Sequence, residues 1–139
     1  MTFNLSFNVK GGDFSNAGKA SSEIKKVLKK LNIDPKGIKR IVVAIYEAEV
    51  NIVAHAWEGR IEAFIGQDEI KVVVSDHGPG ISNIEQAMQP GFSTASKRVR
   101  EMGFGAGMGL ANIEKNVDLL DIQSQVGEGT VLSFTCNYL

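Results

Sequence analysis

The stretch from Ile38 to Trp57 constrains the fold most, because it is long, apolar and periodic. Asp34 before Pro35 is a typical N-cap followed by a first helical residue, and Gly59 is a typical helix stop. We therefore expect one long amphipathic helix over about residues 35–58. Its apolar face would consist of Ile38, Ile41, Ile45, Ala48, Ile52 and Ala56.

Three polar residues lie beside this apolar face. Glu47, Asn51 and His55 are four residues apart, so they form a row along the helix at the border of the core. Taken alone, the row fits two interpretations. The commoner one is a solvated edge with weak contacts between successive turns, and the other is one wall of a partly buried pocket.

Composition limits the class of protein. A chain of 139 residues, 43% apolar and 22% charged, suits a single globular domain with a sizeable core. A net charge of −1 gives no basic excess for nucleic acid or an anionic membrane. The alternating N-terminus is not a signal peptide, and no apolar run reaches membrane-spanning length, so we expect a cytoplasmic protein. The single cysteine, Cys136, excludes an internal disulfide framework and is expected to pack within a strand.

The rest of the chain alternates short periodic segments with turns. We expect strands at 3–9, 60–65, 69–75, 119–126 and 130–138, and helices at 15–31, 82–88 and 108–118. The strand at 69–75 has β-branched residues on both sides and should be an inner one. This order predicts an α+β sandwich, with one layer of helices on a mixed, mostly antiparallel sheet, in a single domain of residues 1–139. Four lysines of the 15–31 helix form a solvated face or a docking face: Lys25, Lys26, Lys29 and Lys30.

Glycines interrupt the second half of the chain. Residues 90–107 show no stable period, and loops of this length are usually functional or disordered. The run G-F-G-A-G-M-G then leads into a helix, which suits phosphate binding or serves only as a hinge. Asp76, followed by Gly78 and Gly80, fits either a site for an amine on a flat ring or an ordinary turn. The chain has no P-loop, dinucleotide fingerprint or nucleophile elbow.

The order of these motifs is more specific than any one of them. It resembles the N box, the glycine boxes and the final G-x-G-T of the Bergerat-fold (GHKL) ATPases, shared by gyrase, heat-shock chaperones, histidine kinases and mismatch-repair proteins. The resemblance covers about residues 10–139. The motifs are Glu47-x-x-x-Asn51-x-x-x-His55, Asp76-x-Gly78-x-Gly80, Gly91-Phe92-Ser93-Thr94, Gly105-x-Gly107-x-Gly109 and Gly127-x-Gly129-Thr130. Within that superfamily, Y-E-A-E-V-N-I-V-A-H-A and G-F-S-T are similar to the stand-alone anti-sigma factors and switch serine-protein kinases of bacterial partner-switching systems.

The resemblance implies ATP and Mg²⁺ as ligands. Asn51 would bind Mg²⁺ between the phosphates, and Glu47 would be the general base that activates a serine hydroxyl of a protein substrate. Asp76 would bind the adenine amine, with Thr130 bonding through water and a lid over residues 90–107. The remaining residues assigned to ATP are His55, Gly78, Gly80, Ser93, Thr94, Gly105, Gly107 and Gly109.

Kinases of this family often carry a basic residue directly before S-G-M-G, and the matching position here is Gly105. The nearest cations, candidates for contacting the γ-phosphate, are Lys97, Arg98 and Arg100. The resemblance implies a serine kinase acting on a small anti-sigma-antagonist-like protein. The alternatives are a non-catalytic, ATP-gated module that sequesters a sigma factor or other regulator, or a detached histidine-kinase catalytic domain. No nucleic-acid or membrane partner is expected, and a homodimer is left open.

Overall fold

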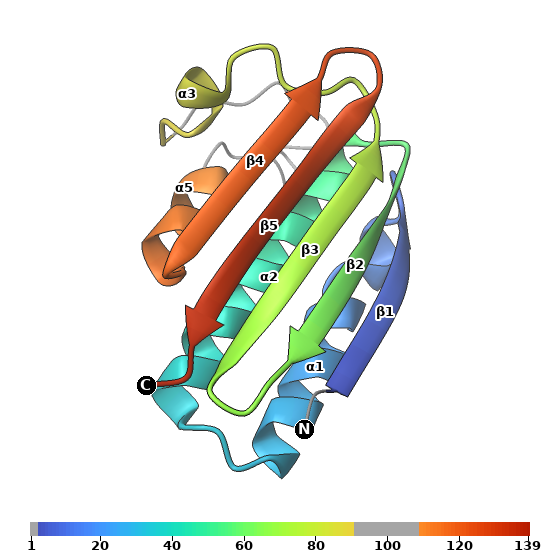
Figure 1. Ribbon diagram of the computed structural model, residues 1–139. Helices are drawn as coiled ribbons and strands as arrows, with labels where there is room; N and C mark the ends of the chain where they lie inside the picture. The colour runs from blue at the N-terminus through green and yellow to red at the C-terminus, as the bar shows by residue number, and fades with distance from the viewer. Residues whose placement is uncertain (1–2, 91–108) are drawn as a thin grey trace.

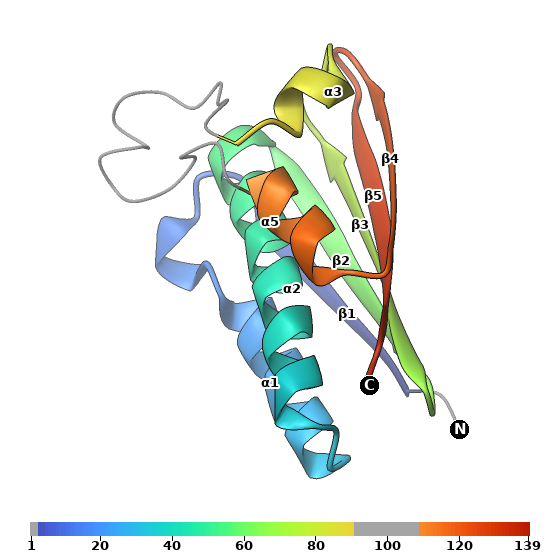
Figure 2. The same ribbon diagram turned by 90° about the vertical axis from the view of Figure 1, so that its left-hand side faces the viewer.

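The computed structural model describes residues 3–90 and 109–139. In them, a five-stranded sheet carries all the helices on one face (Figures 1 and 2). Its strand order is β1-β2-β3-β5-β4, and every pair of neighbouring strands is antiparallel. The elements are β1 (Phe3–Lys10), the short 3-10 helix η1 (Phe14–Asn16), α1 (Lys19–Lys30), α2 (Pro35–His55), β2 (Glu58–Ile65), β3 (Glu69–His77), α3 (Ile84–Ala87), α5 (Gly109–Asn116), β4 (Leu119–Gln125) and β5 (Gly129–Asn137).

The predicted α+β sandwich is confirmed by this arrangement, and the sheet, expected to be mixed and mostly antiparallel, is antiparallel at every pairing that the structure describes. Helix α2 lies across the middle of the sheet, with α1 beside it toward β1 and α5 beside it toward β4 (Figure 1). Strand β3 pairs with β2 on one side and β5 on the other, so it is the inner strand that its β-branched residues predicted. The helical layer therefore covers a continuous apolar face of the sheet.

The core lies between α2 and the sheet. The predicted apolar face of α2 is buried, since its five residues from Ile38 to Ile52 are at most 6% exposed. Ala56, the last residue expected on this face, is partly buried. Cys136 is buried in β5, as predicted for a packed strand thiol. The buried sheet residues of the core include Ile61, Ala63, Ile65, Ile70, Val72, Leu132, Phe134 and Cys136.

Helix α2 begins as predicted but ends earlier. The Asp34 carboxylate accepts a hydrogen bond from the backbone N–H of Lys36 at 2.8 Å, so it is the expected N-cap. The helix ends at His55, and the predicted stop, Gly59, belongs to β2 instead. A Cβ on Gly59 would lie 2.7 Å from the Ile52 side chain. The glycine is therefore needed where α2 packs against the sheet, and it does not terminate the helix.

Helix α1 begins at Lys19, later than predicted, and its start is completed by another helix. Its N-cap residue, Gly18, has no side chain to accept a hydrogen bond. The Glu49 carboxylate of α2 accepts the N–H groups of Ala20 at 3.0 Å and Ser21 at 3.3 Å. Glu49 is only 2% exposed. It satisfies amides that the first turn of any helix leaves open, and it joins α1 to α2.

The outer face of α1 carries the predicted lysine cluster. Lys25, Lys26, Lys29 and Lys30 are all exposed, and Lys26 pairs with Glu23 at 3.2 Å. Their position agrees with a solvated face, and a docking role stays untested. Across 3–90 and 109–139, no helix combines the length and the apolar character needed to cross a bilayer.

Candidate nucleotide-binding site

The polar row of α2 is half-buried and faces α5. Glu47, Asn51 and His55 all have intermediate exposure. The Asn112 side-chain amide of α5 donates a hydrogen bond to Glu47 Oε1 at 3.4 Å. A Cβ on Gly109, the first residue of α5, would lie 2.9 Å from Asn51 Oδ1. Helix α5 lies beside α2 (Figure 2), and Glu47 and Asn51 face it, so this part of the row is not the solvated edge that the helix pattern alone favoured.

The end of the row meets the loop that follows β3. Burial lowers the pKa of His55 below its usual range, so its imidazole is neutral at neutral pH. The next residue, Ala56, packs against Gly78, where a Cβ would lie 2.9 Å from the Ala56 Cα. The close approach at Gly78 brings the loop after β3 to the end of α2.

Asp76 begins a row of polar residues across the sheet. Thr130 lies directly opposite Asp76 on β5, and Ser124 lies opposite Thr130 on β4. The backbone N–H of Thr130 donates to Asp76 Oδ1 at 3.1 Å. Burial raises the pKa of the Asp76 carboxyl, while this hydrogen bond and the nearby His77 oppose the rise. The second carboxylate oxygen can accept a hydrogen bond from a ligand amine.

The two predicted glycine motifs beside Asp76 lie against each other. The backbone N–H of Gly78 donates to the Glu128 carbonyl oxygen at 3.1 Å, which joins the loop after β3 to the β4–β5 turn. Gly80 has a φ of 74°, and a Cβ there would overlap the carbonyl oxygen of Gln125. Glycine is therefore required at this point for both conformation and space.

The structure thus assembles the described part of the predicted site from four separate segments. It brings together Glu47, Asn51, His55, Asp76, Gly78, Gly80, Gly109 and Thr130. The other predicted residues lie outside the described residues, as does the lid after Pro90: Ser93, Thr94, Lys97, Arg98, Arg100, Gly105 and Gly107. The functional roles of both groups stay predictions.

Two polar residues of this region were not singled out from the sequence. Asn112 bonds Glu47, as described above, and Ser124 accepts the backbone N–H of Ile81 at 2.7 Å while contacting the Thr130 hydroxyl at 2.8 Å. Counting across the β4–β5 hairpin turn would have placed Ser124 opposite Thr130. No sequence signal identified Asn112, because its contact depends on how α5 packs against α2.

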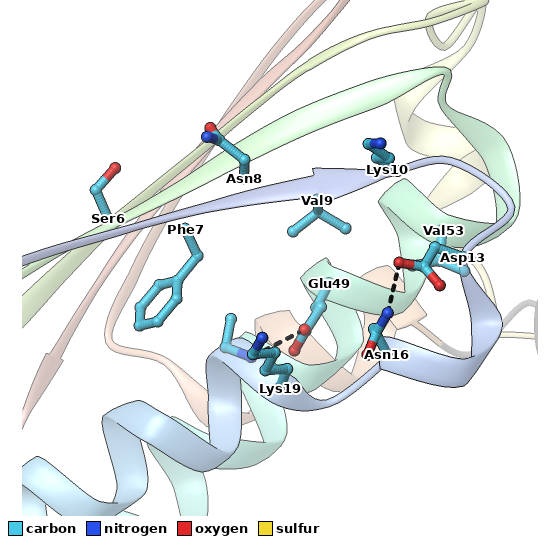
Figure 3. Close-up of a pocket in the computed structure, with 11 residues that line it drawn as sticks. Ser6, Phe7, Asn8, Val9, Lys10, Asp13, Asn16, Lys19, Glu49 and Val53 are labelled. Carbon is cyan, nitrogen blue, oxygen red and sulfur yellow. Dashed lines mark hydrogen bonds between the residues drawn. The ribbon is translucent and has the colours of Figure 1, made fainter.

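A hollow of about 440 Å³ lies on the other side of α2, between β1 and the start of α1 (Figure 3). Phe7 and Val9 point into it from β1, and Glu49 lines it from α2. Glu49 follows Glu47 by two residues, about 200° around the helix, so it faces away from the polar row. Its two carboxylate oxygens already accept the α1 amides. The hollow is therefore separate from the candidate nucleotide site.

Comparison with known proteins defines the class. Residues 13–136 match the family model of the histidine kinase-like ATPase domain, so the chain belongs to this family. ATP is thus the nucleotide that the domain uses. Solved structures agree on the fold: the mycobacterial sensor histidine kinase MprB has a TM-score of 0.54 at 16% identity, covering 97% of each chain. A chain of the SiaB–SiaC complex from Pseudomonas aeruginosa has a TM-score of 0.59 at 13% identity, covering 96% of this chain and 89% of that one.

Closer relatives define the branch. The chain is 37% identical over 103 residues to an anti-sigma F factor of Thermoanaerobacter sp. (strain X514), covering 70% of this chain and 68% of the relative. It is 34% identical over 108 residues to the serine/threonine-protein kinase RsbT of Bacillus subtilis (strain 168), covering 75% of each. The chain therefore belongs to the anti-sigma factor and serine-kinase branch of the histidine kinase-like ATPases, as its motifs predicted.

Proposed function

We propose that this protein is an ATP-dependent serine kinase that phosphorylates a small partner of the anti-sigma-antagonist type in the cytoplasm. One observation carries the proposal: the half-buried Glu47 carboxylate lies one helical turn before Asn51, on the side of α2 that packs against α5. A module that only binds nucleotide needs no carboxylate at this place. The names of the relatives, an anti-sigma F factor and a serine/threonine-protein kinase, support the same conclusion.

The described residues fit a nucleotide with its magnesium ion. Asp76 has one carboxylate oxygen bonded to Thr130 and the other available for the adenine amine. The Asn51 side-chain oxygen is a ligand type that Mg²⁺ accepts, and Gly109 leaves the space beside it that any larger residue would fill. When bound, Mg²⁺ neutralises charge on the phosphates. Backbone N–H groups at the start of α5 can bind the phosphates, since glycine there allows a close approach.

Glu47 would serve as the base in the transfer step. The serine oxygen of the partner forms a bond to the γ-phosphorus, while the bond from that phosphorus to the bridging oxygen of ADP breaks. The hydroxyl proton passes to the Glu47 carboxylate, which must lie within hydrogen-bond reach of the hydroxyl. Asn112 holds Oε1 of this carboxylate in place. His55, whose ring is neutral because burial lowers its pKa, would contact a phosphate or stabilise the pocket without adding charge.

The test combines radiolabelled ATP, Mg²⁺ and the purified protein with small candidate partners encoded beside its gene. We expect label on a serine of one partner, resistant to acid as a phosphoserine is. ATP-dependent retention of a sigma factor or another regulator, without any labelled protein, would instead assign the ATP-gated binding module. Acid-labile label on a histidine of a partner would assign a detached histidine-kinase domain. Light scattering of the same samples would show whether the protein acts as a homodimer.

A further inference from the structure

Ser124 closes the polar row that begins at Asp76. Its side chain lies on the same face of the sheet as Thr130, which faces it across the β4–β5 pair. The Ser124 hydroxyl oxygen lies 2.7 Å from the backbone nitrogen of Ile81, 2.8 Å from Thr130 Oγ1 and 3.1 Å from the carbonyl oxygen of Gly129. Ser124 thus contacts the loop after β3, the β4–β5 turn and the hydroxyl beside Asp76 at once.

A count of protons fixes the direction of these hydrogen bonds. A serine hydroxyl donates one hydrogen bond and accepts up to two. The Ile81 N–H can only donate, and the Gly129 carbonyl can only accept. All three contacts are hydrogen bonds only if Ser124 donates to Gly129 and accepts from both Ile81 and Thr130. In the opposite direction, with Ser124 donating to Thr130, the oxygens of Ser124 and Gly129 would lie 3.1 Å apart with no proton between them.

This direction decides what Thr130 offers to a ligand. Its only hydroxyl proton points to Ser124, so its oxygen turns lone pairs toward the space beside Asp76. Asp76 Oδ1 accepts the Thr130 N–H, which leaves Oδ2 as a second acceptor. Two neighbouring acceptors suit the exocyclic amine of adenine, and they repel a keto oxygen such as that of guanine.

We propose that Ser124 determines the base specificity of the nucleotide site, by holding the Thr130 hydroxyl as an acceptor beside the Asp76 carboxylate. The inference rests on the proposed ATP site and deepens it. Discrimination against a 6-keto purine then depends on two hydrogen-bond acceptors, Asp76 and Thr130, and on a third residue, Ser124, that sets the direction of the Thr130 hydroxyl. Ser124 is in this sense a positioning residue.

The test compares the dissociation constants of ATP and inosine triphosphate by calorimetry. The two nucleotides differ only at the purine 6-position and the adjacent ring nitrogen. We expect the wild-type protein to prefer ATP. In Ser124→Ala, the Thr130 hydroxyl is free to donate to the keto oxygen, so the preference for ATP should shrink by about tenfold, the value of roughly one hydrogen bond. Ser124→Thr keeps the hydroxyl and should keep the preference.

Each other outcome decides against the inference. If Ser124→Ala weakens both nucleotides by the same factor, Ser124 has only a structural role. If the wild-type protein binds both nucleotides equally, the inference fails while the proposed function stands. If it binds neither, the proposed function fails and the inference with it. Should Ser124→Ala not fold, Ser124→Cys serves for the same comparison, because a thiol is a weak acceptor.

Discussion

At the scale of single residues, Asp76 is subject to two opposed effects: burial favours its protonated form, and binding of an amine requires its ionised form. Burial raises the pKa of its carboxyl above the usual 3.8. A raised pKa in the folded state means that folding disfavours the ionised form. The contribution of Asp76 to stability is therefore fully present below pH 3.8 and is lost as the pH rises through the raised pKa. An amine ligand nevertheless needs the ionised form, so we interpret Asp76 as a residue kept for binding at a cost to stability.

The substitution Asp76→Asn separates the effect of Asp76 on stability from its effect on ATP binding. The asparagine oxygen can still accept the Thr130 N–H, and the buried charge is gone. We expect an unchanged or higher melting temperature, while ATP binding weakens by tenfold or more, roughly the value of one hydrogen bond to a charged group. Calorimetry and thermal melts measure both. Asp121→Asn, at an exposed position on β4, is the control and should change neither. Unchanged ATP affinity in Asp76→Asn would count against the adenine assignment.

His55 predicts how the fold responds to acid. Its pKa lies below 6.5 because burial disfavours the imidazolium. The unfolded chain therefore takes up this proton first, and stability falls as the pH drops from about 7 toward the lowered pKa. In His55→Asn this part of the acid sensitivity should disappear, as measured by urea unfolding at several pH values. The exposed His77 provides the control. In His77→Gln, the free energy of unfolding should still fall below about pH 7 as it does in wild type. If the free energy of unfolding depends on pH in the same way in wild type and in His55→Asn, burial of His55 does not contribute to the acid sensitivity.

At the scale of elements, α2 has two acidic residues with opposite surroundings. Glu47 is half-buried beside α5, and Glu49 is buried against the first turn of α1. Glu49→Ala would leave the N–H groups of Ala20 and Ser21 without their acceptor. We expect it to lower the free energy of unfolding by about 2–4 kcal/mol in urea titrations. The matched Glu47→Ala change should cost less than about 1 kcal/mol. Equal losses in the two variants would mean that Glu49 does not cap α1.

The ends of the helices show what local sequence can predict. The start of α2 was predicted correctly, because Asp34 and Pro35 act within one turn. Its end was placed too late, because Gly59 serves the packing of β2 against Ile52, which no local pattern shows. The start of α1 was placed too early, because its cap comes from Glu49, far along the chain. Both the end of α2 and the start of α1 therefore depend on tertiary contacts.

At the scale of the whole molecule, the fold was predictable because the ordered motifs resemble one family over most of the chain. The polar row of α2 also follows from helical spacing alone. What spacing could not show is the set of contacts between α5 and α2: Asn112 with Glu47, and Gly109 with Asn51. These contacts depend on how α5 packs against α2. Packing of the whole fold, more than any one motif, therefore brings the residues of the candidate site together.

We propose that Glu47 makes this nucleotide-binding domain a kinase. The most direct measurement compares wild type and Glu47→Ala for two quantities: the dissociation constant of ATP, and the rate of transfer from labelled ATP to the serine of the partner. Glu47 contacts Asn112 on α5 and lies on a different element from Asp76 and Thr130, so we expect the ATP affinity of Glu47→Ala to stay within about threefold of wild type. We expect the transfer rate to fall by about a hundredfold or more, as for loss of a general base. Transfer that persists at the wild-type rate in Glu47→Ala would show that Glu47 is not the base.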